Sequence, residues 1–193
     1  GDRQDGRDLA VEDANGPGIT IDLAGLHPFE HATVIRLELD GPPQVDDSIH
    51  ADASGTVRLP ATSATLEGPA LRVESYQDAS GSLIPNLGYW SDTTAIASWT
   101  ARLAAGTTYD VEMDFAIKDG AEGGRFELRC GDAVLEIRIL EPTGGWNAFD
   151  QIDVGRISIP SEVGDAAVLI SIRALSIPGE AAGNLRSLIL KPV

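Results

Sequence analysis

Histidine is the residue type most often used by metal hydrolases and by general bases, and the chain has three, His27, His31 and His50. His27 and His31 have the i, i+4 spacing that places two metal ligands on one face of a helix. Pro28 lies inside that turn and would interrupt the helix, because proline lacks an amide proton and clashes with the preceding turn. We therefore predict that the histidines lie in solvent-exposed loops and bind no zinc.

Other catalytic patterns are missing from the sequence. No Gly-x-Ser-x-Gly motif presents a nucleophilic serine. The glycine-rich stretch Gly120–Gly124 lacks the Lys and Ser/Thr of a phosphate-binding loop, so it is predicted to form a hairpin. Paired carboxylates stay open, because 30 Asp and Glu residues offer many pairs and a glycosidase needs only two. Most of these acids alternate with apolar residues and should face solvent, so we expect no active site.

Aromatic residues are few, with three Trp, three Tyr and four Phe, and they could bind sugars. A sugar ring stacks its apolar face on an aromatic ring, while amides or acids bind its hydroxyl groups. Tyr89 follows a predicted loop and Trp146 follows a Gly-Gly turn, so both are candidate platforms. The alternative is that aromatic residues fill the core, and we predict this for Trp90, Trp99 and Phe149.

The composition excludes several classes of protein. The 30 acids and 14 basic residues give a net charge of −16, which would repel a phosphate backbone, so nucleic acid is not expected as a partner. Charged and polar residues interrupt every apolar run well before the roughly 18 residues of a membrane span. Cys130 is the only cysteine, which excludes an internal disulfide. Its place in an alternating run predicts a small buried hydrophobic residue.

Period-two alternation indicates that the chain is all-β. In Tyr109–Ile117, large apolar side chains occupy every second position, as expected for a half-buried strand. Comparable or less regular patterns predict strands at residues 33–39, 97–103, 126–130, 135–139, 152–159, 168–172 and 185–190. Turn sequences separate many of these runs at a spacing of roughly 8 to 12 residues, and no segment has a capped helical repeat. The predicted fold is an antiparallel β-sandwich of the jelly-roll type, preceded by a few extra strands.

A Pro-rich, acidic break near residues 40–54 divides the chain. Residues 9–47 contain only a few short predicted strands, at 9–12, 19–23 and 33–39, which are too few to bury a core of their own. We interpret residues 9–47 as the terminal strands of an incomplete β-domain and residues 55–193 as a whole module. Residues 1–8 are predicted to be a disordered or cloning-derived tail, and they lack the pattern of a signal peptide.

Short motifs in residues 55–193 resemble the galactose-binding-like modules of glycoside hydrolases, notably carbohydrate-binding modules of families 6 and 35. The motifs occur in the family's order: Asn86-Leu87-Gly88-Tyr89-Trp90, Ala97–Trp99, Ala105–Val111, Thr143–Phe149, Val154–Ile157 and Asn184–Leu188. The resemblance implies a galactose-binding-like β-sandwich with a ligand site at its loop end. The residues that match the family's ligand-binding positions are Tyr89, Trp146 and Asn184.

The resemblance also bears on a metal cofactor. The calcium site of these modules uses acidic residues in the first strand and near the end of the last. The corresponding stretches, Val57–Pro60 and Leu188–Leu190, contain no acid. We therefore predict no cofactor, and the missing acids argue against the structural calcium of the family.

Residues 18–23 and 32–41 resemble the last strands of the C-terminal β-domain of bacterial α-L-fucosidases. This resemblance implies that the chain is a non-catalytic, carbohydrate-binding accessory region that follows the catalytic domain of an α-L-fucosidase-like glycoside hydrolase. It also implies that the parent protein is secreted or periplasmic. One alternative is a structural module that packs against the catalytic domain without binding sugar. An independent hydrolase acting through two carboxylates is a third hypothesis.

Overall fold

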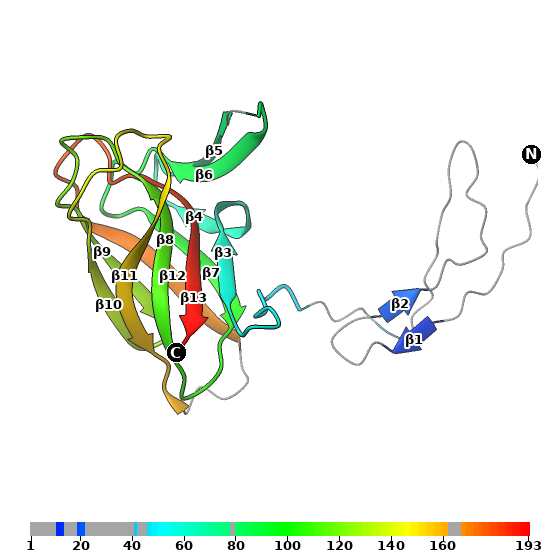
Figure 1. Ribbon diagram of the computed structural model, residues 1–193. Helices are drawn as coiled ribbons and strands as arrows, with labels where there is room; N and C mark the ends of the chain where they lie inside the picture. The colour runs from blue at the N-terminus through cyan, green and yellow to red at the C-terminus, as the bar shows by residue number, and fades with distance from the viewer. Residues whose placement is uncertain (1–10, 14–18, 22–40, 42–45, 78–79, 162–166) are drawn as a thin grey trace, which may run out of the picture. The chain divides into compact units, whose positions relative to one another are not determined.

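The structure is a computed structural model that describes residues 11–13, 19–21, 41, 46–77, 80–161 and 167–193 (Figure 1). The chain divides into two compact units, residues 1–45 and residues 46–193. In the first unit, β1 (Val11–Asp13) and β2 (Ile19–Ile21) form an antiparallel pair. The tail predicted over residues 1–8, the strand predicted over residues 33–39, and His27 and His31 lie outside the described residues.

The second unit is a sandwich of two sheets, as predicted. The five-stranded sheet has the order β10 (Ala133–Arg138), β9 (Arg125–Cys130), β12 (Ala167–Ser176), β7 (Ile96–Arg102) and β4 (Thr65–Glu67). The six-stranded sheet has the order β11 (Asp150–Ser158), β8 (Thr108–Ala116), β13 (Asn184–Pro192), β6 (Leu83–Gly88) and β5 (Arg72–Gln77), with β3 (Val57–Pro60) also paired to β13. The pairs between these strands are antiparallel, and a short 3-10 helix, η1 (Ala61–Ser63), joins β3 to β4.

Alternation along the strands builds the core between the sheets. In β8 the side chains of Tyr109, Val111, Met113 and Phe115 are buried, while the acids between them lie on the solvent face of the six-stranded sheet. The ring of Phe126 on β9 packs edge-on against Phe115 on β8, with ring centroids 5.8 Å apart, which ties the two sheets together.

Three predictions about single core residues are confirmed. Trp90 and Trp99 are buried in the core, and the Nε1 group of Trp99 donates a hydrogen bond to the carbonyl oxygen of Pro60 at 2.9 Å. Cys130 has no exposed surface and forms no disulfide. The predicted strands from residue 97 onward correspond to β7 to β13.

Two predictions about turns and loops were wrong. Gly120–Gly124 does not close a hairpin, because β8 and β9 belong to different sheets and the segment crosses between them. Asn86–Gly88 is the end of β6 and not a loop. Pro85 obscures this strand in the sequence, since proline is disfavoured inside a sheet. It is tolerated here because β6 pairs with β13 only at Leu87, so Pro85 has a strand neighbour on one side.

The second unit begins before residue 55. Ile49 forms an isolated parallel bridge with Ala101, in which its N–H donates to the carbonyl of Thr100 at 2.8 Å. Its own carbonyl accepts from the N–H of Arg102 at 2.9 Å. The Asp46 carboxylate accepts from the same arginine's guanidinium at 2.8 Å. Residues 46–50 are therefore bound to the edge of β7. No helix in the described part of the chain is long and apolar enough to cross a membrane.

Candidate functional site

Tyr89 follows β6 and has an unusual backbone. Its φ of 59° makes it the single non-glycine residue with positive φ in the described part of the chain. A bulky side chain in this left-handed region is an outlier, because its Cβ crowds the backbone. The side chain is 49% exposed, and the guanidinium carbon of Arg72 lies 3.6 Å from the centre of its ring. Tyr89 therefore offers a partly open aromatic face beside a cation, in agreement with its predicted place at the surface.

Asn184 begins β13 and is 4% exposed. Its Nδ2 group donates to the backbone carbonyl of Trp146 at 2.7 Å and to the hydroxyl of Tyr76 at 3.2 Å. Among the described residues no donor binds its Oδ1 atom. The side-chain amide thus fixes the loop of Trp146 against β5 and leaves one acceptor for a further hydrogen bond.

The indole of Trp146 is half-buried and packs against the core, so part of the predicted stacking surface is already used by the fold. Phe149, predicted to fill the core, is instead half-buried outside it. Its ring lies 6.5 Å from that of Tyr76 at an interplanar angle of 58°. The guanidinium carbon of Arg186 lies 3.8 Å from the centre of the same ring.

The residues around Tyr89 and Asn184 lie on the solvent side of strands β5 and β6. Leu87 on β6 pairs with Leu185 on β13, so Asn86 and Gly88 of β6 lie beside Asn184 and Arg186 of β13. Asn86 has no exposed surface, yet neither its Nδ2 nor its Oδ1 atom has a hydrogen-bond partner. An unpaired buried amide is unfavourable by about 1–3 kcal/mol, so such groups in native proteins generally bind water or a ligand.

Glu74 faces Asn86 across β5 and β6, and its side chain lies over Gly88. A Cβ atom at Gly88 would come within 2.1 Å of the Glu74 carboxylate oxygen. Burial raises the pKa of Tyr76, and the nearby Glu74 carboxylate acts in the same direction, although the hydrogen bond from Asn184 opposes both. At neutral pH the Tyr76 hydroxyl therefore keeps its proton.

The name aromatic–amide site is used below for the group of residues Tyr76, Tyr89, Trp146, Phe149, Asn86, Asn184, Glu74, Arg72 and Arg186. It combines ring faces with donors and acceptors, which is the chemistry that binds polyhydroxylated molecules. The site contains no histidine, serine or cysteine. Among the described residues no three His, Cys, Asp or Glu side chains are grouped so as to hold a metal ion.

Sequence reasoning named Tyr89, Trp146 and Asn184 as candidate ligand-binding residues and did not include the residues of β5. The signal was present, because Arg72, Glu74 and Tyr76 alternate with smaller residues as side chains on one face of a strand do. Two local features explain why the strand was not predicted from the sequence. Ser75 interrupts the apolar alternation, and Val73 is still 42% exposed, so the strand has no strongly apolar face.

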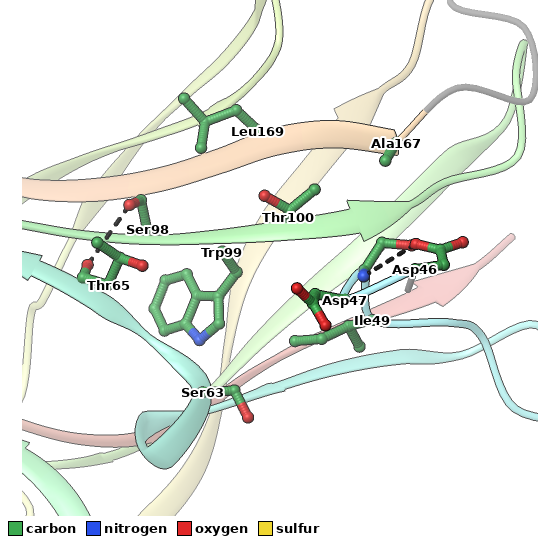
Figure 2. Close-up of a pocket in the computed structure, with 11 residues that line it drawn as sticks. Asp46, Asp47, Ile49, Ser63, Thr65, Ser98, Trp99, Thr100, Ala167 and Leu169 are labelled. Atoms are coloured by element: carbon green, nitrogen blue, oxygen red, sulfur yellow. Dashed lines mark hydrogen bonds between the residues drawn. The ribbon is translucent and has the colours of Figure 1, made fainter. Parts of the chain in front are cut away.

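A pocket with a volume of about 530 Å³ lies elsewhere, beside the edge of the five-stranded sheet (Figure 2). It is formed where residues 46–49 and Ser63–Thr65 approach Ser98–Thr100. Asp46 is already bound by Arg102 and Ser48, and the Ser98 hydroxyl donates to the carbonyl of Thr65. Trp99 is only 2% exposed, so it presents no ring face. This pocket lies where segments at the edge of the sheet meet, and it has no exposed aromatic ring on which a sugar could stack.

Comparison with known proteins places the fold. No protein-family model and no curated protein sequence matches the chain. Among solved structures, the C-terminal CBM6 of LamC, a marine laminarinase from Zobellia galactanivorans, matches with a TM-score of 0.53 and 18% identity, over 70% of this chain and 98% of that chain. A β-1,3-glucan binding CBM6 from Bacillus halodurans matches with a TM-score of 0.51 and 15% identity, over 75% and 99%.

The second unit has the β-sandwich fold of carbohydrate-binding modules. The same fold also occurs in the mosquito-larvicidal Cry4Aa toxin from Bacillus thuringiensis, with a TM-score of 0.56 and 14% identity, over 77% of this chain and 25% of that chain. Identities this low establish the architecture alone. The function must therefore be argued from the side chains.

Proposed function

We propose that the chain is a non-catalytic, carbohydrate-binding accessory region of a glycoside hydrolase and that it binds sugar at the aromatic–amide site. The observation that carries the proposal is Tyr89, which exposes an aromatic ring from a strained backbone three residues after Asn86, whose buried side-chain amide has no hydrogen-bond partner. Strain of this kind persists where a side chain must be held in one place, and it is common at ligand sites.

Each predicted residue has a role in this proposal. Tyr89 stacks on the apolar face of a sugar ring, and the free Oδ1 atom of Asn184 accepts from a hydroxyl group. Trp146, whose loop is bound by Asn184, supplies a second ring with the part of its indole that the core leaves exposed. Glu74 is placed to accept further hydroxyl hydrogen bonds, and Asn86 would bind the ligand or a bridging water.

The parent enzyme and its location are also part of the proposal. We propose that the parent enzyme is α-L-fucosidase-like, that its catalytic domain lies upstream of this chain, and that the protein is secreted or periplasmic. The carbohydrate-binding fold of residues 46–193 and the resemblance of residues 18–23 and 32–41 to a fucosidase β-domain support it. The isolated chain should not hydrolyse an aryl α-L-fucoside, and measurable turnover would show that it carries an active site of its own.

The binding proposal is tested by titrating the chain with fucosylated and other glycans by calorimetry. We expect millimolar or tighter binding of at least one glycan, reduced at least tenfold in Tyr89→Ala. The matched control is Leu169→Ala, which removes a side chain of similar exposure at the rim of the pocket on the other sheet. Binding that is lost in the control but kept in Tyr89→Ala would move the site to that pocket.

The competing function is a structural module that packs against the catalytic domain and binds no sugar. The half-burial of Trp146 and the use of both Asn184 amide protons within the fold favour it. It predicts that no glycan in the panel binds at millimolar concentration, while Tyr89→Ala leaves the chain folded. That result would reject carbohydrate binding and keep the structural role.

A further inference from the structure

Most lysine and arginine side chains of the second unit form ion pairs with carboxylates, as expected in a chain with 30 acids. In the described part of the chain, four arginines form no ion pair with a carboxylate: Arg58, Arg72, Arg138 and Arg186. Three of these lie on the solvent face of the six-stranded sheet, Arg58 on β3, Arg72 on β5 and Arg186 on β13. Arg138 lies on β10 of the other sheet.

Aromatic rings position two of these cations without neutralising them. The guanidinium of Arg72 lies over Tyr89 and that of Arg186 over Phe149, at 3.6 and 3.8 Å from the ring centres. A ring face holds a guanidinium by its π electrons and leaves the N–H groups at the edge of the plane free to donate. The Nε atom of Arg186 is buried and has no acceptor.

The third cation has a neutral partner. A terminal nitrogen of Arg58 donates to the hydroxyl of Ser187 at 3.1 Å, next to Arg186 in β13. Acids are present on this face as well. Asp110 and Glu112 form ion pairs with Arg156 and Lys191, and Glu74 lies above Gly88. Burial raises the pKa of the half-buried Asp114, while the charges of Arg186 and Arg58 act in the opposite direction. Neither Glu74 nor Asp114 forms an ion pair with the three arginines, and Asp114 attracts Arg186 and Arg58 only from a longer distance. Since a carboxylate is the strongest ordinary partner of a guanidinium, the N–H donors of this face stay available for another anion.

We infer that the ligand of the aromatic–amide site is an anionic sugar, whose carboxylate or sulfate group accepts hydrogen bonds from Arg72 while its ring stacks on Tyr89. The inference rests on the proposed function and names the class of ligand. A guanidinium matches the paired oxygens of either group in a bidentate arrangement. Arg186 and Arg58 extend the row of donors along the sheet, in the direction that a longer anionic glycan would follow.

The test compares three sugars that differ mainly at C6: galactose, galacturonate and galactose 6-sulfate. Calorimetric titration of the full chain should show at least tenfold tighter binding of one anionic form than of galactose, and the tighter one identifies carboxylate or sulfate as the source. Arg72→Gln should reduce the affinity for that form at least fivefold more than it reduces the affinity for galactose, because only the anionic form loses its hydrogen bonds to the guanidinium. Arg186→Gln should act in the same direction on an anionic oligosaccharide. The control is Arg138→Gln, which removes an equally unpaired charge from the opposite sheet and should change neither affinity.

Two results would overturn the inference while the proposed function stands. In one, galactose binds as tightly as both anionic sugars. In the other, Arg138→Gln weakens anion binding as much as Arg72→Gln does, which would reduce the effect to long-range charge. Failure of all three sugars and of the neutral glycan panel would instead reject carbohydrate binding itself, so the two failures are distinguishable.

Discussion

Tyr89 combines an unfavourable backbone conformation with a half-exposed side chain. Substitutions can separate the effect of the backbone on stability from the effect of the ring on binding. Asparagine tolerates the left-handed region, whereas a β-branched residue does not. We expect Tyr89→Asn to unfold in urea with a free energy within about 1 kcal/mol of the parent chain, and Tyr89→Val to lose about 1–3 kcal/mol. Both should lose sugar binding, because both lack the ring. Equal stabilities of the two variants would show that the positive φ is not retained in solution.

Cys130 gives a prediction about pH. Burial raises the pKa of its thiol to about 12, from 9.0 when unperturbed. Between these values the unfolded chain loses a proton that the folded chain keeps, so the free energy of unfolding falls as pH rises, by about 1.4 kcal/mol per pH unit. The stabilising contribution is fully present below pH 9. Urea unfolding at pH 8 and pH 11 should show a smaller loss in Cys130→Ala than in the parent chain, and an equal loss would contradict the assignment.

At the scale of elements, the turn before β13 sets the position of Asn184. Gly183 has a φ of 133°, and a Cβ atom there would lie 2.0 Å from the ring of the buried Phe115. Gly183→Ala should therefore lower the free energy of unfolding by about 2–4 kcal/mol, through strain and displacement of a core ring.

The matched control is Gly144→Ala. Gly144 has a φ of 97° but no neighbouring atom within 4 Å of the added Cβ, so only backbone strain applies and a loss of about 1 kcal/mol is expected. Chemical denaturation of the two variants measures the difference. If they are equally destabilised, the contact with Phe115 is not what requires glycine at position 183.

The elements also show why the sequence predicted some strands and not others. In β8 the large apolar side chains all enter the core, so period-two alternation appears directly in the sequence. In β5 and β6 the pattern fails, because Pro85 and Asn86 precede the buried Leu87 in β6 and Val73 of β5 is 42% exposed. The candidate site is built largely on these two strands. Its loop residues could be predicted by resemblance, but Arg72, Glu74 and Asn86 became evident only through their neighbours in space.

At the scale of the whole molecule, the sandwich begins earlier in the chain than the sequence predicts. The composition break predicts a start at residue 55, whereas the compact unit starts at Asp46. Alternation could not reveal this, since residues 46–50 contribute one apolar side chain, Ile49, to the core and are otherwise bound by hydrogen bonds and by the Asp46–Arg102 ion pair.

This difference predicts the behaviour of two truncated chains. Residues 46–193 should fold independently, because they contain both sheets and the segment that covers the edge of β7. Residues 55–193 should be less stable by about 2–4 kcal/mol, since the truncation exposes apolar surface under Ile49 and leaves the edge groups of β7 without their partners. Urea unfolding of both chains measures the difference. Ile49→Ala in the longer chain should reproduce part of the loss by removing the apolar contact alone. Equal stability of the two truncated chains would place the start of the module at residue 55 and make residues 46–50 an accessory to the edge of the sheet rather than part of the folding unit.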